Sequence, residues 1–370
     1  MTKNREIFLS LVRSSLWGTV CADIPSDPDW DEIMTLAVRQ TLAVLISDAV
    51  QSLPADRKPS SDIISHLFGL SVSNIRTHAL INRKLAETVG VMKQNGIRTV
   101  LFKGQGLAQN YLNPLLRQCG DIDLYVGDAQ YKRSYEVAVE AFGSHADDSE
   151  SIKHYHLNNG GVTVELHRIA ESLPGRAVNR RFQEWSLKHL HGDRLRKVTI
   201  DGAEVLLPPF DFDPVYVMNH AWHHFMNGGI GLRQVCDWTL YLHHYHQHIN
   251  PAELEQTLRS FRILKAWHLF AGIAVRHLGL PSEECPLYCD KYSKLSDKVL
   301  EMILDEGNFG RNSDWRKSRR PEGYSTGKLH SLKWRTKRFL DGLKIDAAAS
   351  TRYYIAFLQA GISAYIKGLK

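Results

Sequence analysis

The most informative stretch of the chain reads Arg117-Gln118-Cys119-Gly120-Asp121-Ile122-Asp123-Leu124-Tyr125-Val126. Apolar residues alternate with polar ones in its second half, which is the period of a half-buried β-strand. We therefore predict a strand over residues 122–126. Residues i and i+2 of a strand point to the same side of a sheet, so Asp121 and Asp123 should present two carboxylates side by side.

Two adjacent carboxylates predict a metal site. Like charges this close repel one another unless a cation lies between them. Oxygen ligands suit Mg²⁺, which retains water molecules and accepts substrate phosphates as further ligands. An isolated Asp-x-Asp pair is also common on solvated protein surfaces, so the pair alone leaves that alternative open.

A glycine-rich turn precedes this stretch. Residues 97–103 form a β-rich run that ends at Lys103, and Gly104-Gln105-Gly106 interrupts it before a short helix expected at 106–112. Glycine allows the backbone to approach a phosphate, and the amides at a helix N-terminus favour anions. Such turns also contain glycine for purely steric reasons, so this feature is weak evidence when taken alone.

A third strand is predicted after Gly160-Gly161. In Val162-Thr163-Val164-Glu165-Leu166-His167 the apolar side chains face one way, and the polar ones face the other. If this strand lies next to the Asp-x-Asp strand, Glu165 joins the two aspartates. Otherwise Glu165 and His167 simply belong to the polar side of an amphipathic strand.

Helical patterns dominate the remainder of the sequence. A hairpin turning at Asp201-Gly202 is expected over 195–207. The predicted fold is therefore α/β (α+β), with a small mixed sheet embedded in a largely helical protein. We divide the chain into a helical region 1–95, a core 96–210 and a helical domain 211–370. Helices are expected within 1–53 and at 61–95, 129–142, 213–227, 232–247, 251–261, 263–278, 292–304, 329–343 and 347–368.

Composition excludes several classes of protein. The chain has 370 residues, of which 43% are hydrophobic and 23% charged, as in ordinary globular proteins. It has no run of 18 apolar residues and no obvious signal cleavage site, so we expect a cytoplasmic protein without a membrane span. Its five cysteines are an odd number, which argues against a disulfide framework and favours reduced thiols.

The positive charge is concentrated in one late segment. Residues 311–344 contain eleven Lys or Arg and three Asp or Glu, a net charge of +8, so the rest of the chain carries −2 of the total +6. This segment is a candidate for binding RNA or an acidic partner. A solvated surface segment is an equal alternative.

The order of these motifs resembles the DNA polymerase beta-like nucleotidyltransferase superfamily. Within it, the chain is similar to an uncharacterised bacterial family with the pattern Leu-Lys-Gly, Arg, Gly-Asp-Ile-Asp-Leu and Glu-Leu-His. Toxin-type and abortive-infection nucleotidyltransferases are more distant relatives. In this chain the residues that match the pattern are 101–104, Arg117, 120–124 and 165–167.

The resemblance implies transfer of a nucleoside monophosphate from an NTP to an acceptor hydroxyl of a small molecule, protein or RNA. It implies that Asp121, Asp123 and Glu165 are catalytic residues and bind Mg²⁺, with Mn²⁺ as an alternative ion. The metal would neutralise the triphosphate and lower the pKa of the acceptor hydroxyl. The residues that it places near the nucleotide or its phosphates are Lys103, Gly104, Gln105, Gly106, Arg117, Gly120 and His167.

One departure from the superfamily pattern concerns the way in which the nucleotide is bound. The turn usually contains Gly-Ser, but here it is Gly104-Gln105-Gly106, so the serine contact to the triphosphate is missing. A catalytically inactive nucleotide-binding or scaffold protein, and a toxin-like enzyme that acts on transfer RNA, remain as alternatives.

Later residues offer weaker candidates. His220 and His224 have the i, i+4 spacing of a zinc pair, but packing of His220 behind the site is the favoured interpretation. Arg233 and Asp237 are also four residues apart, which predicts a helical salt bridge. The family resemblance adds a second interpretation, in which either residue lines the nucleotide pocket.

Overall fold

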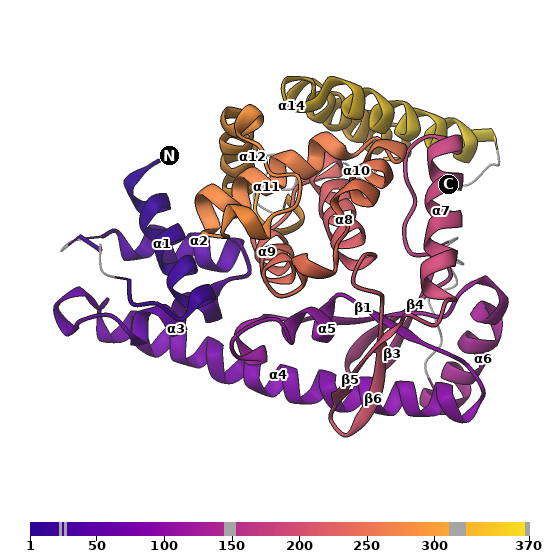
Figure 1. Ribbon diagram of the computed structural model, residues 1–370, viewed down its shortest axis with the longest axis horizontal. Helices are drawn as coiled ribbons and strands as arrows, with labels where there is room; N and C mark the ends of the chain where they lie inside the picture. Colours follow the sequence, from indigo (N-terminus) through magenta and orange to yellow (C-terminus); the bar gives the residue numbers. More distant parts are fainter. Residues whose placement is uncertain (22–23, 26–27, 144–152, 311–322, 367–370) are drawn as a thin grey trace.

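The computed structural model describes residues 1–21, 24–25, 28–143, 153–310 and 323–366. Figure 1 shows a small sheet flanked by helices, with the long helix α4 (Ser61–Gln94) along one side of the molecule and α14 (Tyr324–Ile366) along the opposite side. The predicted α+β architecture, a small mixed sheet within a largely helical protein, is confirmed.

The sheet has six strands in the order β3-β4-β2-β1-β6-β5. β2 runs parallel to β4, with Asp123 beside Glu165, and antiparallel to β1, with Phe102 opposite Asp123. The strands are β1 (Val100–Phe102), β2 (Asp121–Tyr125), β3 (His154–Asn159), β4 (Val162–His167), β5 (Arg196–Ile200) and β6 (Ala203–Leu207).

Alternation along the strands separates two cores. On one face Leu101, Ile122 and Leu124 pack with the second half of α4 and with α6 (Tyr131–Phe142). On the other face, the Phe102 ring contacts that of Tyr216, with centroids 4.6 Å apart. Asp121 and Asp123 share this second face, so the strand period directs both carboxylates toward the helical part of the protein.

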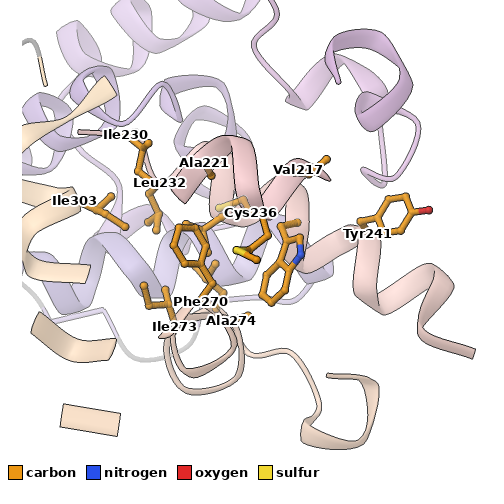
Figure 2. Packing of buried hydrophobic residues seen from close by; sticks show 14 of the residues in the cluster. Val217, Ala221, Ile230, Leu232, Cys236, Tyr241, Phe270, Ile273, Ala274 and Ile303 are labelled. Atoms are coloured by element: carbon orange, nitrogen blue, oxygen red, sulfur yellow. The ribbon is translucent and has the colours of Figure 1, made fainter. Parts of the chain in front are cut away.

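The second face is covered by the larger core, part of which is shown in Figure 2. Its helices come from both ends of the chain, since α1 (Lys3–Trp17) packs against α3 (Ala43–Gln51) and α11 (Leu264–Leu278). Other helices that contribute to it include α2 (Trp30–Arg39), α8 (Asp213–Asn227), α9 (Arg233–Tyr245), α10 (Pro251–Ser260) and α12 (Ser293–Glu306). The divisions at residues 95 and 210 stay a prediction.

Most predicted elements are present, with four differences. β3 and α7 (Arg176–Leu190) were not predicted, and the short helix α5 (Gly104–Ala108) begins two residues early. The β5–β6 hairpin turns at Asp201-Gly202, both with positive φ, as predicted. α14 begins at Tyr324, inside the expected connector, and is interrupted at Asp346, where φ is −147°.

Two other expectations can be compared with the structure. All five cysteines are free thiols. Within the described ranges, every helix is too short or too polar to cross a membrane.

Candidate functional site

A cleft of about 220 Å³ lies between the carboxylate-bearing face of the sheet and helices α8 and α9. It brings together residues that are up to 134 positions apart in the chain, from Lys103 to Asp237. Its walls are formed by Lys103, Gly104, Leu107, Arg117, Asp121, Asp123, Lys153, His154, Glu165, His167, Val217, His220, His224, Arg233, Gln234 and Asp237.

The three predicted carboxylates all line this cleft. Parallel pairing of β2 with β4 sets Glu165 beside Asp123, and Asp121 lies two residues earlier on the same face. Asp123 is only 2% exposed, whereas Asp121 is exposed. Partial desolvation of the Asp121 carboxyl by its neighbours in the cleft, and then the adjacent charge of Asp123, raise the pKa of Asp121. The cluster therefore concentrates negative charge at the cleft, as the sequence predicted.

Lys103 supplies positive charge at the same point. Its Nζ lies 3.1 Å from Asp123 Oδ1, because the end of β1 is opposite Asp123 in the sheet. Burial lowers the pKa of Lys103, but Asp123, Asp121 and Glu165 outweigh it and raise the pKa above its ordinary value. The backbone of Lys103 has φ +51°, a conformation that costs a residue with a side chain about 1 kcal/mol or more. Such strain is typical of functional turns.

His167 connects two of the carboxylates. Its Nε2 lies 2.9 Å from Asp123 Oδ1 and 3.3 Å from Glu165 Oε2, and its side chain is buried. Burial lowers the pKa of His167, but the two hydrogen bonds outweigh it and raise the pKa above its ordinary value. The ring therefore orients both carboxylates. A direct contact of His167 with the nucleotide stays a prediction.

Only part of the glycine-rich turn faces the cleft. Lys103 and Gly104 line it, but the Gln105 side chain is buried and donates a hydrogen bond to Asn82 on α4. A Cβ on Gly106 would lie 2.8 Å from a Leu207 methyl group, so this glycine is required for packing against β6. The side chain of Gln105 is therefore directed away from any bound phosphate.

Two other predicted features of the phosphate site contribute little at the cleft. Gly120 is absent from its walls, and a Cβ added there would meet nothing within 4 Å. α5 has only five residues, which is too short for a substantial helix dipole. Lys103 therefore provides the positive charge of the turn.

Arg117 is buried and already paired. Its Nε and Nη2 donate to Asp237 Oδ1 and Oδ2 at 2.8 and 2.9 Å, and Tyr111 Oη donates to the same carboxylate. The predicted i, i+4 salt bridge between Arg233 and Asp237 is therefore wrong, because Asp237 is directed at an arginine 120 residues away. The charge of Arg117 is compensated within the protein, which reduces its capacity to bind phosphate.

Arg233 differs from Arg117 in this respect. It donates to the carbonyl of Gln118, and its buried Nε has no hydrogen-bond partner. In the described part of the chain it forms no ion pair with a carboxylate. Burial, together with repulsion from Arg117, lowers the pKa of Arg233. This side chain lines the cleft with an uncompensated positive charge, and a bound anion would relieve that cost.

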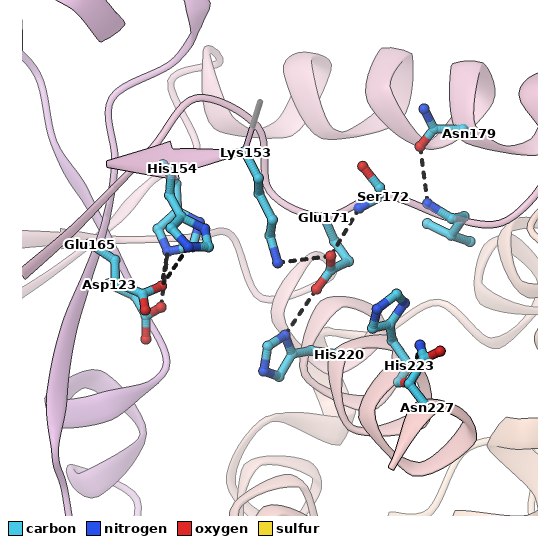
Figure 3. A network of polar contacts seen from close by, with 12 residues as sticks. Asp123, Lys153, His154, Glu165, Glu171, Ser172, Asn179, His220, His223 and Asn227 are labelled. Carbon is cyan, nitrogen blue, oxygen red and sulfur yellow. Dashed lines mark hydrogen bonds and ion pairs between the residues drawn. The ribbon is translucent and has the colours of Figure 1, made fainter. Parts of the chain in front are cut away.

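A second polar network closes the other side of the cleft (Figure 3). The buried Glu171 carboxylate accepts from Lys153 Nζ at 2.8 Å and contacts His220 Nδ1 at 3.0 Å. His220 Nε2 lies 3.4 Å from Lys103 Nζ. Since Lys103 can only donate, these partners assign the proton of His220 to Nδ1. His220 thus joins Glu171 to Lys103 and lies at the cleft itself, not behind it as expected.

Sequence patterns gave little indication of this network. Glu171 and Lys153 lie in connections between elements, where no periodicity applies. The His154-x-His156 alternation just before Gly160-Gly161 is the sequence signal for the unpredicted strand β3.

The basic segment can be assessed only in part, since residues 311–322 lie outside the described residues. Within α14, Arg335 Nη1 donates at 2.7 Å to the carbonyl of Asn227, and Arg338 pairs with Glu306. These two arginines hold α14 against α8 and α12. RNA or an acidic partner at 311–344 stays a prediction.

Comparison with known proteins is consistent with this geometry. A family model described as an uncharacterised nucleotidyltransferase matches residues 26–279. The chain belongs to this family. It is therefore a nucleotidyltransferase, with an NTP as substrate. The matched range contains every predicted site residue and ends before the basic segment. No curated protein and no solved structure gives a significant match.

Proposed function

We propose that this nucleotidyltransferase is metal-dependent and moves a nucleoside monophosphate from an NTP to an acceptor hydroxyl at the carboxylate face of the sheet. One observation carries the proposal. The parallel register of β2 and β4 places Asp123 beside Glu165, with Asp121 on the same face and Lys103 in contact. An anionic cluster at the wall of a cleft that also contains uncompensated positive charge suits a metal-bound triphosphate.

The residues present fit a divalent cation. Asp121 is exposed to the cleft, and in the described ranges no Lys, Arg or His pairs with it. Its raised pKa reflects desolvation first and then repulsion from Asp123, and a bound cation would offset both. We propose that Asp121, Asp123 and Glu165 hold Mg²⁺, with Mn²⁺ as an alternative ion. When bound, the metal would neutralise phosphate charge and lower the pKa of the attacking hydroxyl.

The chain's own residues would mainly position the substrate. Lys103 and Arg233 both line the cleft, and both can donate to phosphate oxygens. His220 accepts from Lys103 while it donates to Glu171, which fixes the direction of the lysine. Arg117 would position the substrate only indirectly, because its ion pair with Asp237 anchors the loop before β2 to α9.

The experiment uses the purified full chain, each of four α-labelled NTPs, Mg²⁺ or Mn²⁺, and a cell extract as the source of acceptor. Asp121→Asn is the test variant, since it removes one charge and keeps the shape. Asp193→Asn, at an exposed loop position outside the cleft, is the matched control.

We expect label to enter a product with wild type and with Asp193→Asn, and to be nearly absent with Asp121→Asn. The labelled species then identifies the acceptor as a small molecule, a protein or RNA, including transfer RNA. If no nucleotide is transferred and NTP binding does not depend on a divalent metal, the proposal fails. A scaffold with the nucleotidyltransferase fold would then be the better description.

A further inference from the structure

Two histidines and a glutamate meet at the β3–β4 edge of the cleft. The antiparallel register places His154 directly opposite His167, and Glu165 lies two residues before His167 on β4. One donor atom from each of the three side chains lies within 4.8 Å of the other two. Glu165 Oε2 is 3.3 Å from His167 Nε2 and 3.9 Å from His154 Nε2. In the described part of the chain, this is the only such group of three.

These spacings are close to those around a bound ion. Donors that bind one tetrahedral ion at 2.0–2.2 Å lie about 3.5 Å from one another, so the 3.3 Å pair already fits. The two pairs that include His154, one at 3.9 Å and one within 4.8 Å, require the His154 side chain to move closer. His154 and Glu165 are each only partly buried, with 18% of the side chain exposed, which leaves room for that movement and for entry of an ion.

The donor set differs from that of a magnesium site. Mg²⁺ prefers oxygen ligands and an octahedral shell, whereas imidazole nitrogen suits ions such as Zn²⁺, Ni²⁺ and Fe²⁺, and Co²⁺ can take the place of Zn²⁺ as a coloured probe. Two imidazoles and one carboxylate therefore select against Mg²⁺ by ligand type. Asp123 Oδ1 lies 2.9 Å from His167 Nε2, so this carboxylate oxygen is near enough to act as a fourth ligand.

We propose that His154, Glu165 and His167 form a binding site for a transition-metal ion that fills without nucleotide. The site shares Glu165 with the carboxylate cluster, yet its existence does not depend on the proposed transfer reaction. Each histidine would bind the ion as a neutral imidazole through the ring nitrogen that carries no proton, so only a ring that is protonated on both nitrogens would release one proton to solvent on binding. The nucleotidyltransferase would then carry a resident nitrogen-ligated ion next to the place where a metal-bound triphosphate is expected.

The test is a titration of tag-free, full-length protein with Co²⁺, followed by visible absorption, and with Zn²⁺, followed by calorimetry. No NTP is present. His154→Ala and His167→Ala remove the proposed ligands. His66→Ala, at an exposed position on α4, is the histidine control, and Asp121→Asn tests dependence on the carboxylate cluster. Thermal unfolding with and without metal supplies a second measurement for each variant.

We expect one Co²⁺ per chain with absorption bands of a nitrogen-ligated ion, and an increase in Tm on binding. His154→Ala and His167→Ala should weaken binding by about 100-fold or more and abolish the increase in Tm, while His66→Ala and Asp121→Asn retain both. A tenfold excess of Mg²⁺ over Co²⁺ should not remove the bands.

Equal binding by His154→Ala and wild type would overturn the proposal, as would complete displacement by Mg²⁺ or loss of binding in Asp121→Asn. Those results would instead indicate a single oxygen-ligated site. Failure of the transfer reaction is a separate result, because metal binding is measured here without nucleotide. A protein that binds Co²⁺ through His154 but transfers no label would retain this inference and lose the proposed function.

Discussion

The two walls of the cleft differ in how they are built. The sheet wall takes Asp121, Asp123 and Glu165 from two paired strands, whose register fixes where each carboxylate lies. The helical wall takes Arg233 from α9 and His220 from α8. Each contacts a residue more than 100 positions earlier in the chain, Gln118 and Lys103 respectively. The sheet wall concentrates negative charge, whereas Arg233 on the helical wall has no carboxylate partner among the described residues. An anion with a bound cation would therefore match both walls.

The two arginines that line the cleft, Arg117 and Arg233, show a similar contrast. Arg117 forms a bidentate pair with Asp237, and burial of that pair is compensated within the protein. Arg233 has a hydrogen bond to a carbonyl but no carboxylate partner in the described part of the chain. This difference predicts that Arg117 acts mainly on stability and Arg233 mainly on substrate binding.

The largest effect is expected on breaking the buried pair. Arg117→Ala leaves the Asp237 carboxylate buried without its cation and should lower the free energy of unfolding by about 3–5 kcal/mol. Urea denaturation would measure it. Arg194→Ala, which breaks an exposed pair with Asp211, is the matched control and should cost about 1 kcal/mol or less. Similar losses for the two variants would show that the buried pair has no special role.

The next largest effect is expected at Asp121 in the sheet wall, where substitution should change activity but not stability. Asp121→Asn should reduce nucleotidyl transfer by about 10²- to 10³-fold, since it removes a proposed metal ligand at the cleft. Its stability should be unchanged or slightly greater, because one of two neighbouring like charges is lost. Labelled-product assays and urea denaturation on the same preparation measure both quantities.

Asp123→Asn should be compared with Asp121→Asn. Asp123 is buried against Lys103 and His167, so its replacement should reduce activity and stability together. If Asp121→Asn also destabilised the fold, the two aspartates would have the same structural role, and the assignment of Asp121 to substrate chemistry would lose its support.

The sheet wall could be predicted from sequence because strand geometry is local. A period of two places Asp121 and Asp123 on one face, and apolar alternation identifies which face is buried. The helical wall could not be predicted in this way. Arg233 and Asp237 have the spacing of a helical salt bridge, and only the packing of α9 against the loop before β2 turns Asp237 toward Arg117. Glu171 lies outside any periodic element, so no pattern marked it.

A smaller effect is expected from the uncompensated arginine. Arg233→Gln keeps much of the side-chain volume but removes the charge that faces the cleft. We expect KM for the NTP to rise about tenfold, which corresponds to loss of one charge-assisted hydrogen bond. The melting temperature should be unchanged or higher, because a buried unpaired charge is costly. A fall in stability without a change in KM would contradict the comparison with Arg117.

The last prediction concerns pH and the histidines of the helical wall. Burial, then the neighbouring His223 and Lys103, lower the pKa of His224 to about 4. Its ordinary pKa is near 6.5, so below that pH the unfolded chain binds a proton that the folded chain does not. The contribution of His224 to stability is therefore complete above pH 6.5 and is lost as the pH falls toward 4. The charged groups that act on it are His223, Lys103, Glu171 and Lys153.

Urea midpoints measured between pH 7.5 and 4.5 would test this assignment. His224→Gln cannot take up the proton, so its stability should fall less steeply over that range than that of the wild type. The exposed His66→Gln on α4 is the matched control and should follow the wild-type slope. If His224→Gln and wild type lose stability in parallel, protonation of other groups causes the acid sensitivity. The helical wall would then not depend on a neutral histidine at this position.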